Sequence, residues 1–432
     1  MAHVTMLALG SRGDVQPFVA LGGALVAQGH TACIAAPADY QALVADAGLA
    51  WRPIGGSIRE LMDPGLVHDA LDAANHRLPL GFAQRFLEHV EPFVEQIVAD
   101  CWRAAQGADV LVVSSLGMYP GVSIAERLRI PLVPAHMHPF AATRAFPDMS
   151  FPPLPGWLPG GSAYNLLTHA FGAHGLWQLL RSALNRARRA VLGLPALSPL
   201  ALWRWARAVP PLVLHAYSAH VAPRPADWDA RQQITGYWRQ DRATTWQPPA
   251  ALAAFLADGP PPVYVGFGSM LVGRDPQTVT ALVVDALERA GQRGILFRGW
   301  GDMDTTNLPE SVHAIDDVPH DWLFPHLAAV VTHGGAGTTA AALHAGLPPV
   351  VVPFFGDQRF WGAQVERLGV GPKPIPRAQL DATRLARAMT VATSDQSMRN
   401  RAAALGQRLH GENGAQHAAH ILTTMLAKGR PL

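Results

Sequence analysis

Short apolar runs alternate with longer amphipathic segments along the first half of the chain. An apolar run at Val4–Leu9 is followed by a helical pattern at Val15–Gln28 and by a second apolar run at Thr31–Ala36. This alternation is typical of parallel β-strands joined by crossover helices. The same order of strand, helix and strand recurs at Ala108–Ser114, Gly121–Leu128 and Pro131–Ala135. The first half therefore predicts a doubly wound α/β domain.

The second half repeats the pattern without repeating the sequence. Pro262–Phe267 and Gly294–Arg298 have the composition of buried strands, and Gln277–Ala290 between them has a helical period. Two such halves predict an α/β protein with two Rossmann-like, doubly wound domains that face each other across a cleft. The expected parts are an N-terminal domain at residues 1–235, a linker rich in Pro and Trp at 236–261, a C-terminal domain at 262–412 and a C-terminal helix at 413–432.

Composition fits a globular protein and argues against several other classes. The chain has 432 residues, of which 49% are hydrophobic and 15% charged, which suits two large cores. A formal net charge of +2 gives no electrostatic reason to expect a nucleic-acid partner. Cys33 and Cys101 stand in apolar surroundings, so we expect buried thiols rather than a disulfide or a metal pair. Because we find no secretion signal and no apolar run of ~18–20 residues, we expect a cytoplasmic protein.

The stretch His333–Thr339 carries the most chemical information. It follows the apolar run Leu327–Val331 and precedes a short helical segment, so glycine-rich backbone would lie at a helix N-terminus, where phosphate binds well. Further along, Asp357 and Gln358 follow a second apolar run, Pro349–Val352. An acid beside an amide can hydrogen-bond several sugar hydroxyls. A phosphate cradle followed by a hydroxyl-binding pair predicts a nucleotide-sugar site.

These motifs resemble the donor-binding signature of nucleotide-sugar-dependent glycosyltransferases with two Rossmann-like domains, the GT-B type. Within that group, residues 315–376 are most similar to the sterol glucosyltransferase branch, in the segments Val318–Phe324, Pro353–Gln358 and Gly371–Ile375. The N-terminal stretch Gly10–Pro17 matches this branch too, and antibiotic glycosyltransferases carry a close variant of it. The resemblance implies that the N-terminal domain binds the acceptor, that the C-terminal domain binds the nucleotide sugar, and that the C-terminal helix packs back on the N-terminal domain.

The resemblance, together with the position of each residue after its strand, assigns the donor site. The phosphate contacts comprise the side chains of Ser269 and His333, the backbone of Gly335, Ala336 and Gly337, and the backbone and hydroxyl of Thr338. The resemblance assigns the nucleotide base to Val318 and His320, and the sugar hydroxyls to Asp357 and Gln358. Trp361 is expected either to stack on the sugar or acceptor or to pack in the core.

Asp14 is the expected catalytic base, in a loop that it shares with Ser11, Arg12 and Gly13 after the first strand. In plant relatives a catalytic His occupies the matching position, and an Asp supports it from a later strand. The comparable segment here, Ser114–Leu116, has no acid. A carboxylate base needs no supporting acid. The Asp in place of the His and the missing acid at Ser114–Leu116 are therefore consistent with each other. The alternative role for Asp14 is to cap the helix that follows.

His136 and His138 follow the strand Pro131–Ala135 and offer another assignment. They are rival catalytic bases, because histidine is the side chain that most often transfers protons in enzymes. Otherwise we expect them to line the acceptor pocket.

The resemblance implies an inverting, metal-independent glycosyltransferase that moves a hexose to a hydroxyl of an apolar acceptor, such as a sterol, triterpenoid, polyketide or lipid. UDP-glucose is the favoured donor. Plant relatives have a ribose-binding Glu where this chain has Ala341, so a dTDP-deoxysugar is the alternative. The nucleotide sugar is a co-substrate, and we expect no metal and no cofactor, because a helix N-terminus and backbone N–H groups can hold the diphosphate. Less favoured alternatives are a nucleotide-sugar epimerase or hydrolase and a non-catalytic helper protein.

The segment from Met149 to Ala226 contains seven Arg and no acidic residue. It also contains Trp157, Trp177, Trp203 and Trp205. A basic and aromatic segment predicts weak peripheral contact with an anionic membrane surface. The alternative is an Arg-rich outer helix face with the Trp side chains in the core.

Overall fold

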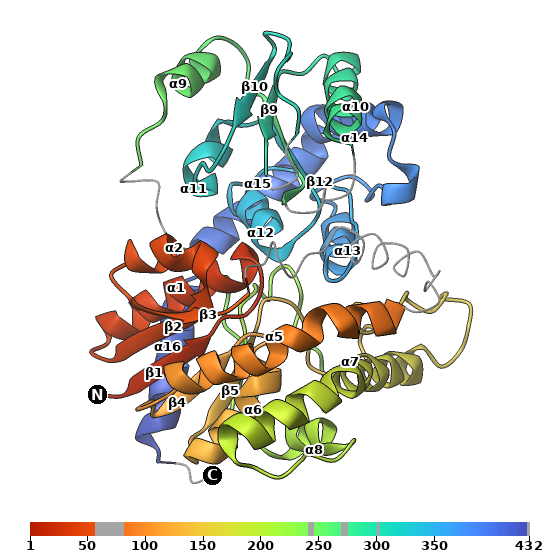
Figure 1. The fold of residues 1–432 in the computed structure, drawn as a ribbon. Coiled ribbons are helices and arrows are strands. Elements are labelled where there is room, and N and C mark those ends of the chain that lie inside the picture. Colours follow the sequence, from red (N-terminus) through yellow and green to blue (C-terminus); the bar gives the residue numbers. More distant parts are fainter. Residues whose placement is uncertain (57–81, 241–245, 269–274, 300–302, 430–432) are drawn as a thin grey trace. The chain divides into compact units, whose positions relative to one another are not determined.

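Two α/β units make up the part of the chain that the computed structural model describes, residues 1–56, 82–240, 246–268, 275–299 and 303–429 (Figure 1). The first unit holds the described residues up to 240 together with the C-terminal segment from Asn413. The second unit holds the described residues from 246 to 412, so it includes part of the expected linker. Each unit contains a parallel sheet with helices packed on it, which confirms the predicted fold class.

The sheet of the first unit is parallel throughout. Its strands are β1 (His3–Leu7), β2 (Thr31–Pro37), β3 (Ala50–Ile54), β4 (Val110–Val113), β5 (Leu132–His136), β6 (Val213–His215) and β7 (Gln232–Ile234). Within the described residues the order across the sheet is β3-β2-β1-β4-β5-β6-β7, and each neighbouring pair is parallel. Every residue of β4 and β5 is buried, which explains why these strands read as continuous apolar runs.

Helices pack on this sheet, and one of them comes from the end of the chain. The helices are α1 (Arg12–Ala27), α2 (Gln41–Ala45), α5 (Phe82–Ala104), α6 (Met118–Leu128), α7 (Gly161–Leu192), α8 (Ala201–Ala208) and α16 (Gly414–Ala427), with a 3₁₀ turn at Ala38–Tyr40. Helix α16 packs along α1, and Thr423 Oγ1 donates a hydrogen bond to Gln28 Oε1 over 3.3 Å. A Cβ atom on Gly414 would lie 2.5 Å from the Tyr237 carbonyl oxygen, so α16 begins tight against the backbone of this unit.

The sheet of the second unit is parallel as well. Its strands are β8 (Val263–Gly266), β9 (Gly294–Phe297), β10 (Val312–Ile315), β11 (Ala329–Thr332) and β12 (Pro349–Val351). They lie in the order β10-β9-β8-β11-β12 in the described residues. The helices are α9 (Ala250–Ala257), α10 (Pro276–Arg289), α11 (His320–Leu323), α12 (Ala336–His344), α13 (Gln358–Leu368), α14 (Ala382–Ser394) and α15 (Gln396–His410), with 3₁₀ turns at Phe324–His326 and Arg377–Gln379.

The strand order places a topological switch point in each sheet. In the first sheet the chain builds β2 and β3 on one side of β1 and then places β4 on the other side. In the second sheet the same change of direction separates β8 from β11. Ligands of doubly wound folds bind outside the carboxyl ends of the strands at such points. The loop with Asp14 follows β1, and His333 follows β11, so both predicted sites lie at switch points.

The two cysteines and the lengths of the helices bear on expectations about the chain. Cys33 and Cys101 are free thiols, 3% and 0% exposed, which confirms that they are buried cysteines rather than a disulfide. None of the helices in the described ranges combines the length and the apolar character that a bilayer-crossing segment requires.

Acids from neighbouring helices compensate part of the positive charge of the acid-free segment. Arg188, on α7, is 2% exposed, and its Nη2 atom bonds both carboxylate oxygens of Glu126 on α6 at 2.7 and 2.8 Å. Arg186 forms an ion pair with Glu91 on α5. Arg188 therefore belongs to the core, and the expectation that it contributes to a positive outer surface is wrong. The side chain of Arg207 lies outside the described part of the structure.

The apolar side chains of this segment divide between core and surface. Trp177 is 1% exposed, and its indole N–H donates to the Pro199 carbonyl oxygen at 2.8 Å. Trp157, by contrast, is 81% exposed, and Leu167 and Phe171 on the amino-terminal half of α7 are 57% and 64% exposed. Trp205 packs partly buried against the core, and the Trp203 side chain lies outside the described residues. The first third of the segment thus carries its most exposed large apolar side chains, whereas exposed Arg side chains such as Arg189 and Arg204 lie further along.

Candidate active site

A glycine-rich turn follows β11 and leads into α12. Gly334 has a φ of 89°, and Gly335 is the N-cap residue of α12. A Cβ atom on Gly335 would lie 2.4 Å from Nε2 of His333, so a larger residue would displace that ring. The first N–H groups of a helix have no intrahelical partner, and with the helix dipole they can bind an anion such as a diphosphate. The predicted phosphate contacts Ala336, Gly337 and Thr338 are the first residues of α12.

His333 lies beside this turn, directly after β11. The residue is half-buried, but its Nδ1 atom is fully buried and has no hydrogen-bond partner among the described residues. Burial lowers the pKa of His333 to about 4, although a hydrogen bond with the Gly266 backbone opposes the shift. The ring is therefore neutral near pH 7. Of the two ring nitrogens, Nε2 is the one next to the Gly335 turn, so it is the nitrogen that can face an anion there.

The loop after β8 borders the same turn. Gly268 has a φ of 60°, and a Cβ atom there would lie 3.2 Å from Cε1 of His333. The two loops at the switch point of the second sheet are thus in contact. Ser269, a predicted phosphate contact, is the next residue but lies outside the described residues, so its assignment stays a prediction.

Asp357 and Gln358 stand at the start of α13, where each makes a contact within the protein. The Oδ2 atom of Asp357 accepts a hydrogen bond from the Trp361 indole N–H at 2.9 Å. Gln358 is 4% exposed, and its Oε1 atom accepts bonds from the backbone N–H groups of Phe354 at 2.7 Å and Phe355 at 3.2 Å. Gln358 therefore shapes the loop that precedes α13. The assignment of both residues to sugar hydroxyls stays a prediction.

The other donor-site residues are aromatic or apolar. Trp361 is 1% exposed, so protein atoms cover its ring, and of its two expected roles the structure favours core packing over stacking on a ligand. His320 begins α11, and its ring stacks on that of Phe324 with the centroids 4.4 Å apart. Val318 packs, partly buried, against the same core cluster. Val318 and His320 follow β10 at the carboxyl edge of the second sheet, and their assignment to the nucleotide base stays a prediction.

Asp14 lies in the first turn of α1 and completes its N-terminal cap. Its Oδ2 atom accepts hydrogen bonds from the backbone N–H of Ser11 at 2.8 Å and from the Ser11 hydroxyl at 3.1 Å. A Cβ atom on Gly10, which has a φ of 135°, would lie 2.2 Å from the same oxygen. Gly13 is exposed, and Arg12 Nε donates to the side chain one turn further along α1. The N-cap residue is Ser11, and Asp14 is the N3 acid of a capping box, so Asp14 supports the helix start without being the N-cap itself. A capping carboxylate can still accept a proton, so the role as base stays a prediction.

His136 and His138 stand beside a third histidine, His215. His136 ends β5, His215 ends β6, and the two residues are paired in register. The His136 ring centroid lies 5.7 Å from that of His215 and 6.5 Å from that of His138. Burial, followed by the two neighbouring histidines, lowers the pKa of His136 well below its usual value. Nδ1 of His136 is hydrogen-bonded to the Ser115 hydroxyl at 2.9 Å.

Sequence reasoning did not identify Ser115 or His215 as site residues. A single His at the end of the short apolar strand β6 resembles a core residue, and Ser115 belongs to an ordinary strand-to-helix turn. The signal that would have identified them is their position at the carboxyl end of a strand. Both follow or end strands of a parallel sheet on the same side as His136, and such strands share one carboxyl edge.

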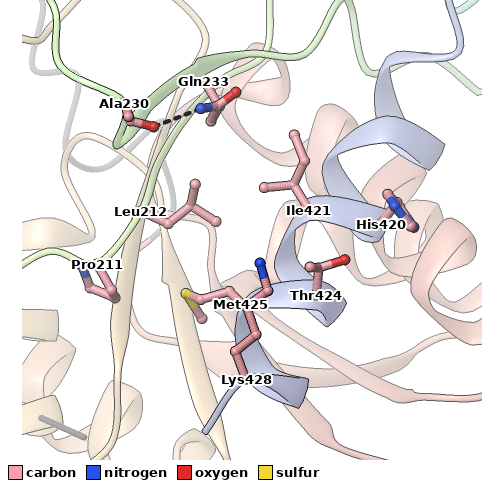
Figure 2. A pocket seen from close by; sticks show the side chains of 9 residues that line it. All are labelled: Pro211, Leu212, Ala230, Gln233, His420, Ile421, Thr424, Met425 and Lys428. Carbon is pink, nitrogen blue, oxygen red and sulfur yellow. Dashed lines mark hydrogen bonds between the residues drawn. The ribbon is translucent and has the colours of Figure 1, made fainter. Parts of the chain in front are cut away.

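A hollow of about 370 Å³ lies between β6, β7 and α16, away from these residues (Figure 2). It is lined by Pro211, Leu212, Ala230, Gln233, His420, Ile421, Thr424, Met425 and Lys428. The lining has no carboxylate, and Pro211 and Leu212 precede β6, at the amino end of that strand. The hollow therefore has neither the acids nor the position expected of the reaction site. In the described residues there is also no cluster of three or more His, Cys, Asp or Glu that could hold a metal ion.

Two family models match the chain, one in each half. The model described as "Glycosyltransferase family 28 N-terminal domain" matches residues 4–147. The model described as "Erythromycin biosynthesis protein CIII-like, C-terminal domain" matches residues 296–425. The first match includes the loop with Asp14, and the second includes the turn at His333 and the start of α13.

Similar curated proteins are sterol 3-beta-glucosyltransferases of fungi. The protein of Emericella nidulans is 38% identical over 431 residues, which cover 97% of this chain and 30% of the relative. The protein of Leptosphaeria maculans is 36% identical over 441 residues, which cover 99% of this chain and 29% of the relative. The chain thus spans less than a third of the length of these relatives.

Solved structures with the same fold are glycosyltransferases. The calicheamicin glycosyltransferase CalG4 matches with a TM-score of 0.69 and 19% identity over all of both chains. The glycosyltransferase VinC, solved in complex with dTDP, matches with a TM-score of 0.67 and 18% identity over 99% of this chain and all of that one. At these identities the comparison shows the fold.

Proposed function

The chain belongs to the GT-B glycosyltransferases, and from this premise we propose that it transfers a hexose from a nucleoside-diphosphate sugar to a hydroxyl group of an apolar acceptor. The observation that carries the proposal is the anion site at the start of α12. There a glycine N-cap, the first N–H groups of the helix and Nε2 of the His333 ring lie together. This arrangement suits the diphosphate of a nucleotide sugar, because the leaving group carries negative charge that grows during transfer.

A sterol is the favoured acceptor. The support is that relatives 36–38% identical over nearly the whole chain carry the name sterol 3-beta-glucosyltransferase. Triterpenoids, polyketides and other lipids share the chemistry of a hydroxyl on an apolar skeleton and remain in the proposed class. UDP-glucose is the favoured donor, and a dTDP-deoxysugar is the second candidate because the fold is shared with VinC, whose structure contains dTDP.

The proposed reaction inverts the anomeric carbon in one displacement. Asp14 accepts the proton of the acceptor hydroxyl while the oxygen attacks the anomeric carbon on the face opposite the diphosphate. The bond between that carbon and the diphosphate oxygen breaks, and its electron pair leaves with the diphosphate. The N–H groups of Ala336, Gly337 and Thr338 and the ring of His333 stabilise the charge, so we propose that no metal is required. Asp357 and Gln358 orient the sugar, and Val318 and His320 contact the base.

Release of nucleoside diphosphate, measured with and without an acceptor, tests this function. We expect release from UDP-glucose to depend on a sterol such as cholesterol dispersed in cyclodextrin, and to persist in excess EDTA. Release that is independent of any alcohol would identify a hydrolase, and conversion of the sugar without release would identify an epimerase. Loss in EDTA that Mg²⁺ restores would contradict the metal-free mechanism. Parallel assays with dTDP-sugars decide between the two donor classes.

Two glycines of the turn provide a matched pair of variants. A Cβ atom on Gly335 would lie 2.4 Å from the His333 ring, whereas nothing lies within 4 Å of a Cβ atom on Gly337. We expect Gly335→Ala to abolish diphosphate release and UDP binding, because the His333 ring would be displaced from the anion site. Gly337→Ala should keep UDP binding measurable. Equal effects of the two substitutions would mean that the turn does not hold the diphosphate.

A further inference from the structure

A row of hydrogen-bonding side chains crosses four neighbouring strands of the first sheet. It consists of Ser115 after β4, His136 at the end of β5, His215 at the end of β6 and Gln232 at the start of β7. The Ser115 hydroxyl lies 2.9 Å from His136 Nδ1, and His215 Nε2 lies 2.8 Å from Gln232 Oε1. Between these two pairs the imidazole rings lie with their centroids 5.7 Å apart and their planes tilted by 43°, and Nδ1 of His215 has no hydrogen-bond partner among the described residues. We call these four residues the histidine row.

The histidine row has one end that a ligand can reach. Ser115 is half-buried, and its neighbour Leu116 is 48% exposed. Inward from Ser115 the exposed fraction falls to 3% at His136 and to 0% at His215. Ser115 is therefore more exposed than either histidine, so a substrate on its side of the row that does not enter the core can be affected by the two histidines only through Ser115.

At the inner end of the row, contacts determine the orientation and the tautomer of His215. The carbonyl oxygen of Gln232 accepts the hydrogen bond, so Nε2 of His215 carries the ring proton and Nδ1 carries a lone pair. The ring also stacks on Trp228, with the centroids 4.3 Å apart and the planes 17° apart. Burial lowers the pKa of His215 to about 4, although its hydrogen bond with Gln232 opposes the shift. His215 is consequently a neutral and immobile neighbour of His136.

The same surroundings keep His136 neutral. Its pKa is lowered by burial and then by the like charges that His215 and His138 would carry. A neutral His136 holds the Ser115 hydroxyl in one orientation through a single hydrogen bond. The row therefore presents an oriented, uncharged hydroxyl at its outer end, which can exchange a hydrogen bond with the hydroxyl of an alcohol.

Ser115 stands next to the loop of the proposed base. Strands β4 and β1 are neighbours, and the hydroxyl of Ser114 donates to the Leu9 carbonyl oxygen at 2.9 Å and accepts from the Leu9 N–H at 3.1 Å. These bonds fasten the end of β4 to the segment that leads to Asp14. The carboxyl edge of the sheet thus brings Ser115 and Asp14 onto adjacent strand ends.

We infer that Ser115 contacts the hydroxyl of the acceptor alcohol, and that His136 and His215 are positioning residues that hold Ser115 in place. This inference rests on the proposed glycosyl transfer and adds the residue that orients the attacking oxygen. A neutral hydrogen bond contributes about 0.5–1.5 kcal/mol, which corresponds to a roughly three- to tenfold change in rate or affinity.

The test compares Ser115→Ala, Ser115→Thr and His215→Phe with wild type in diphosphate release from UDP-glucose, using cholesterol as acceptor. We expect Ser115→Ala to lower kcat/KM for cholesterol roughly three- to tenfold, and Ser115→Thr, which keeps the hydroxyl, to retain most of it. UDP affinity should not change in either variant. Ser182→Ala is the matched control, because that exposed hydroxyl bonds only Arg186 among the contacts described on α7.

The pH profile distinguishes positioning from a general loss of stability. Without His215, protonation of His136 becomes easier, so the acidic limb of kcat/KM should move to higher pH in His215→Phe. The inference is overturned if Ser115→Ala equals wild type, or if His215→Phe lowers activity equally at every pH. If the wild-type protein releases no diphosphate with any donor and alcohol, the proposed function itself fails, and the inference fails with it.

Discussion

At the scale of single residues, Asp14 combines a structural contact with a proposed chemical one. Asp14→Asn should lower turnover by roughly 10²-fold or more, the lower range for a general base, while UDP affinity stays near wild type. An Asn keeps a carbonyl oxygen that can accept the bonds from Ser11, so the cap of α1 should survive. Steady-state kinetics and calorimetry with UDP measure the two quantities.

Ser11→Ala is the control for the Asp14 prediction. It removes the hydroxyl that donates to the Asp14 carboxylate but leaves the carboxylate and its bond from the Ser11 N–H in place, so we expect a loss of about 0.5–2 kcal/mol in the free energy of unfolding but little loss of turnover. If Asp14→Asn stays active while His136→Ala or His138→Ala abolishes turnover, a histidine is the base.

His333 gives a second prediction at this scale, because its ring is neutral in the free protein. His333→Ala should weaken UDP binding by about 1–3 kcal/mol, the scale of a charge-assisted or buried hydrogen bond. The diphosphate should also raise the lowered pKa of His333, so binding takes up protons and the affinity rises as pH falls. Calorimetry at pH 8 and pH 6 measures both effects.

UDP itself also titrates, but this contribution is the same for both proteins. Subtracting the pH dependence of UDP affinity in His333→Ala from that of wild type therefore leaves the contribution of His333. His313→Ala is the matched control, since burial also lowers the pKa of His313, which stands on β10. An unchanged affinity in His333→Ala would mean that this side chain only packs.

At the scale of elements, the start of α13 should separate sugar recognition from nucleotide binding. Asp357→Ala should weaken binding of UDP-glucose much more than binding of UDP, because the residue is assigned to sugar hydroxyls. Gln358→Ala should do the same and also lower stability, because its Oε1 atom bonds two backbone N–H groups of the preceding loop. Isothermal titration with both ligands and a thermal melt give the comparison. Equal losses for UDP and UDP-glucose would place the pair on the nucleotide.

The burial of side chains on and next to helix α7 indicates which residues would carry the predicted membrane contact. Because Arg188 is buried and Arg186 is paired, contact with a bilayer should depend on the exposed apolar side chains Trp157, Leu167 and Phe171 more than on charge. We expect weak co-sedimentation with vesicles that contain anionic lipid. Replacing these three residues by Gln should abolish it, whereas the control Arg189→Gln, at an exposed position, should reduce it only at low salt. An unchanged sedimentation of the triple variant would exclude this surface.

A feature can be predicted from the sequence when neighbouring residues of the chain determine it, and not when it depends on contacts between distant segments. Strands β4 and β11 are buried on both faces, so each is a continuous apolar run. Strand β3 has exposed residues and a Pro, and β6 is three residues long, so neither has a period that can be recognised. The turn at Gly335 was predictable because all its chemistry lies in consecutive residues. The partnership of Ser115, His136 and His215 depends on strand order, which a single sequence does not state.

At the scale of the whole molecule, buried neutral histidines should make stability depend on pH. The pKa of His215 is about 4 in the folded protein and ~6.5 when unfolded, so the unfolded chain binds more protons between these values. This contribution is fully present above about pH 6.5 and is lost as pH falls toward 4. For His215 alone the loss between pH 7 and pH 5 is roughly 2 kcal/mol. His136 and His333 act in the same direction.

Hydrogen exchange of the β6 amides at pH 7 and pH 5, corrected for intrinsic rates, measures this dependence. His215→Phe should flatten it, while His417→Phe, at an exposed position on α16, should leave it unchanged. An equally steep dependence in His215→Phe would assign the effect to other groups.

The return of the last helix to the first unit has a consequence for synthesis on the ribosome. The face of α1 that α16 covers is synthesised before the second unit, whereas α16 is synthesised after it. Domains usually fold as soon as they emerge. Here the second unit can finish first, and the first unit must wait with an uncovered helix while the intervening residues are made. Until α16 has been made, a nascent chain of this protein therefore exposes the apolar face of α1, which is the kind of surface that ribosome-associated chaperones bind.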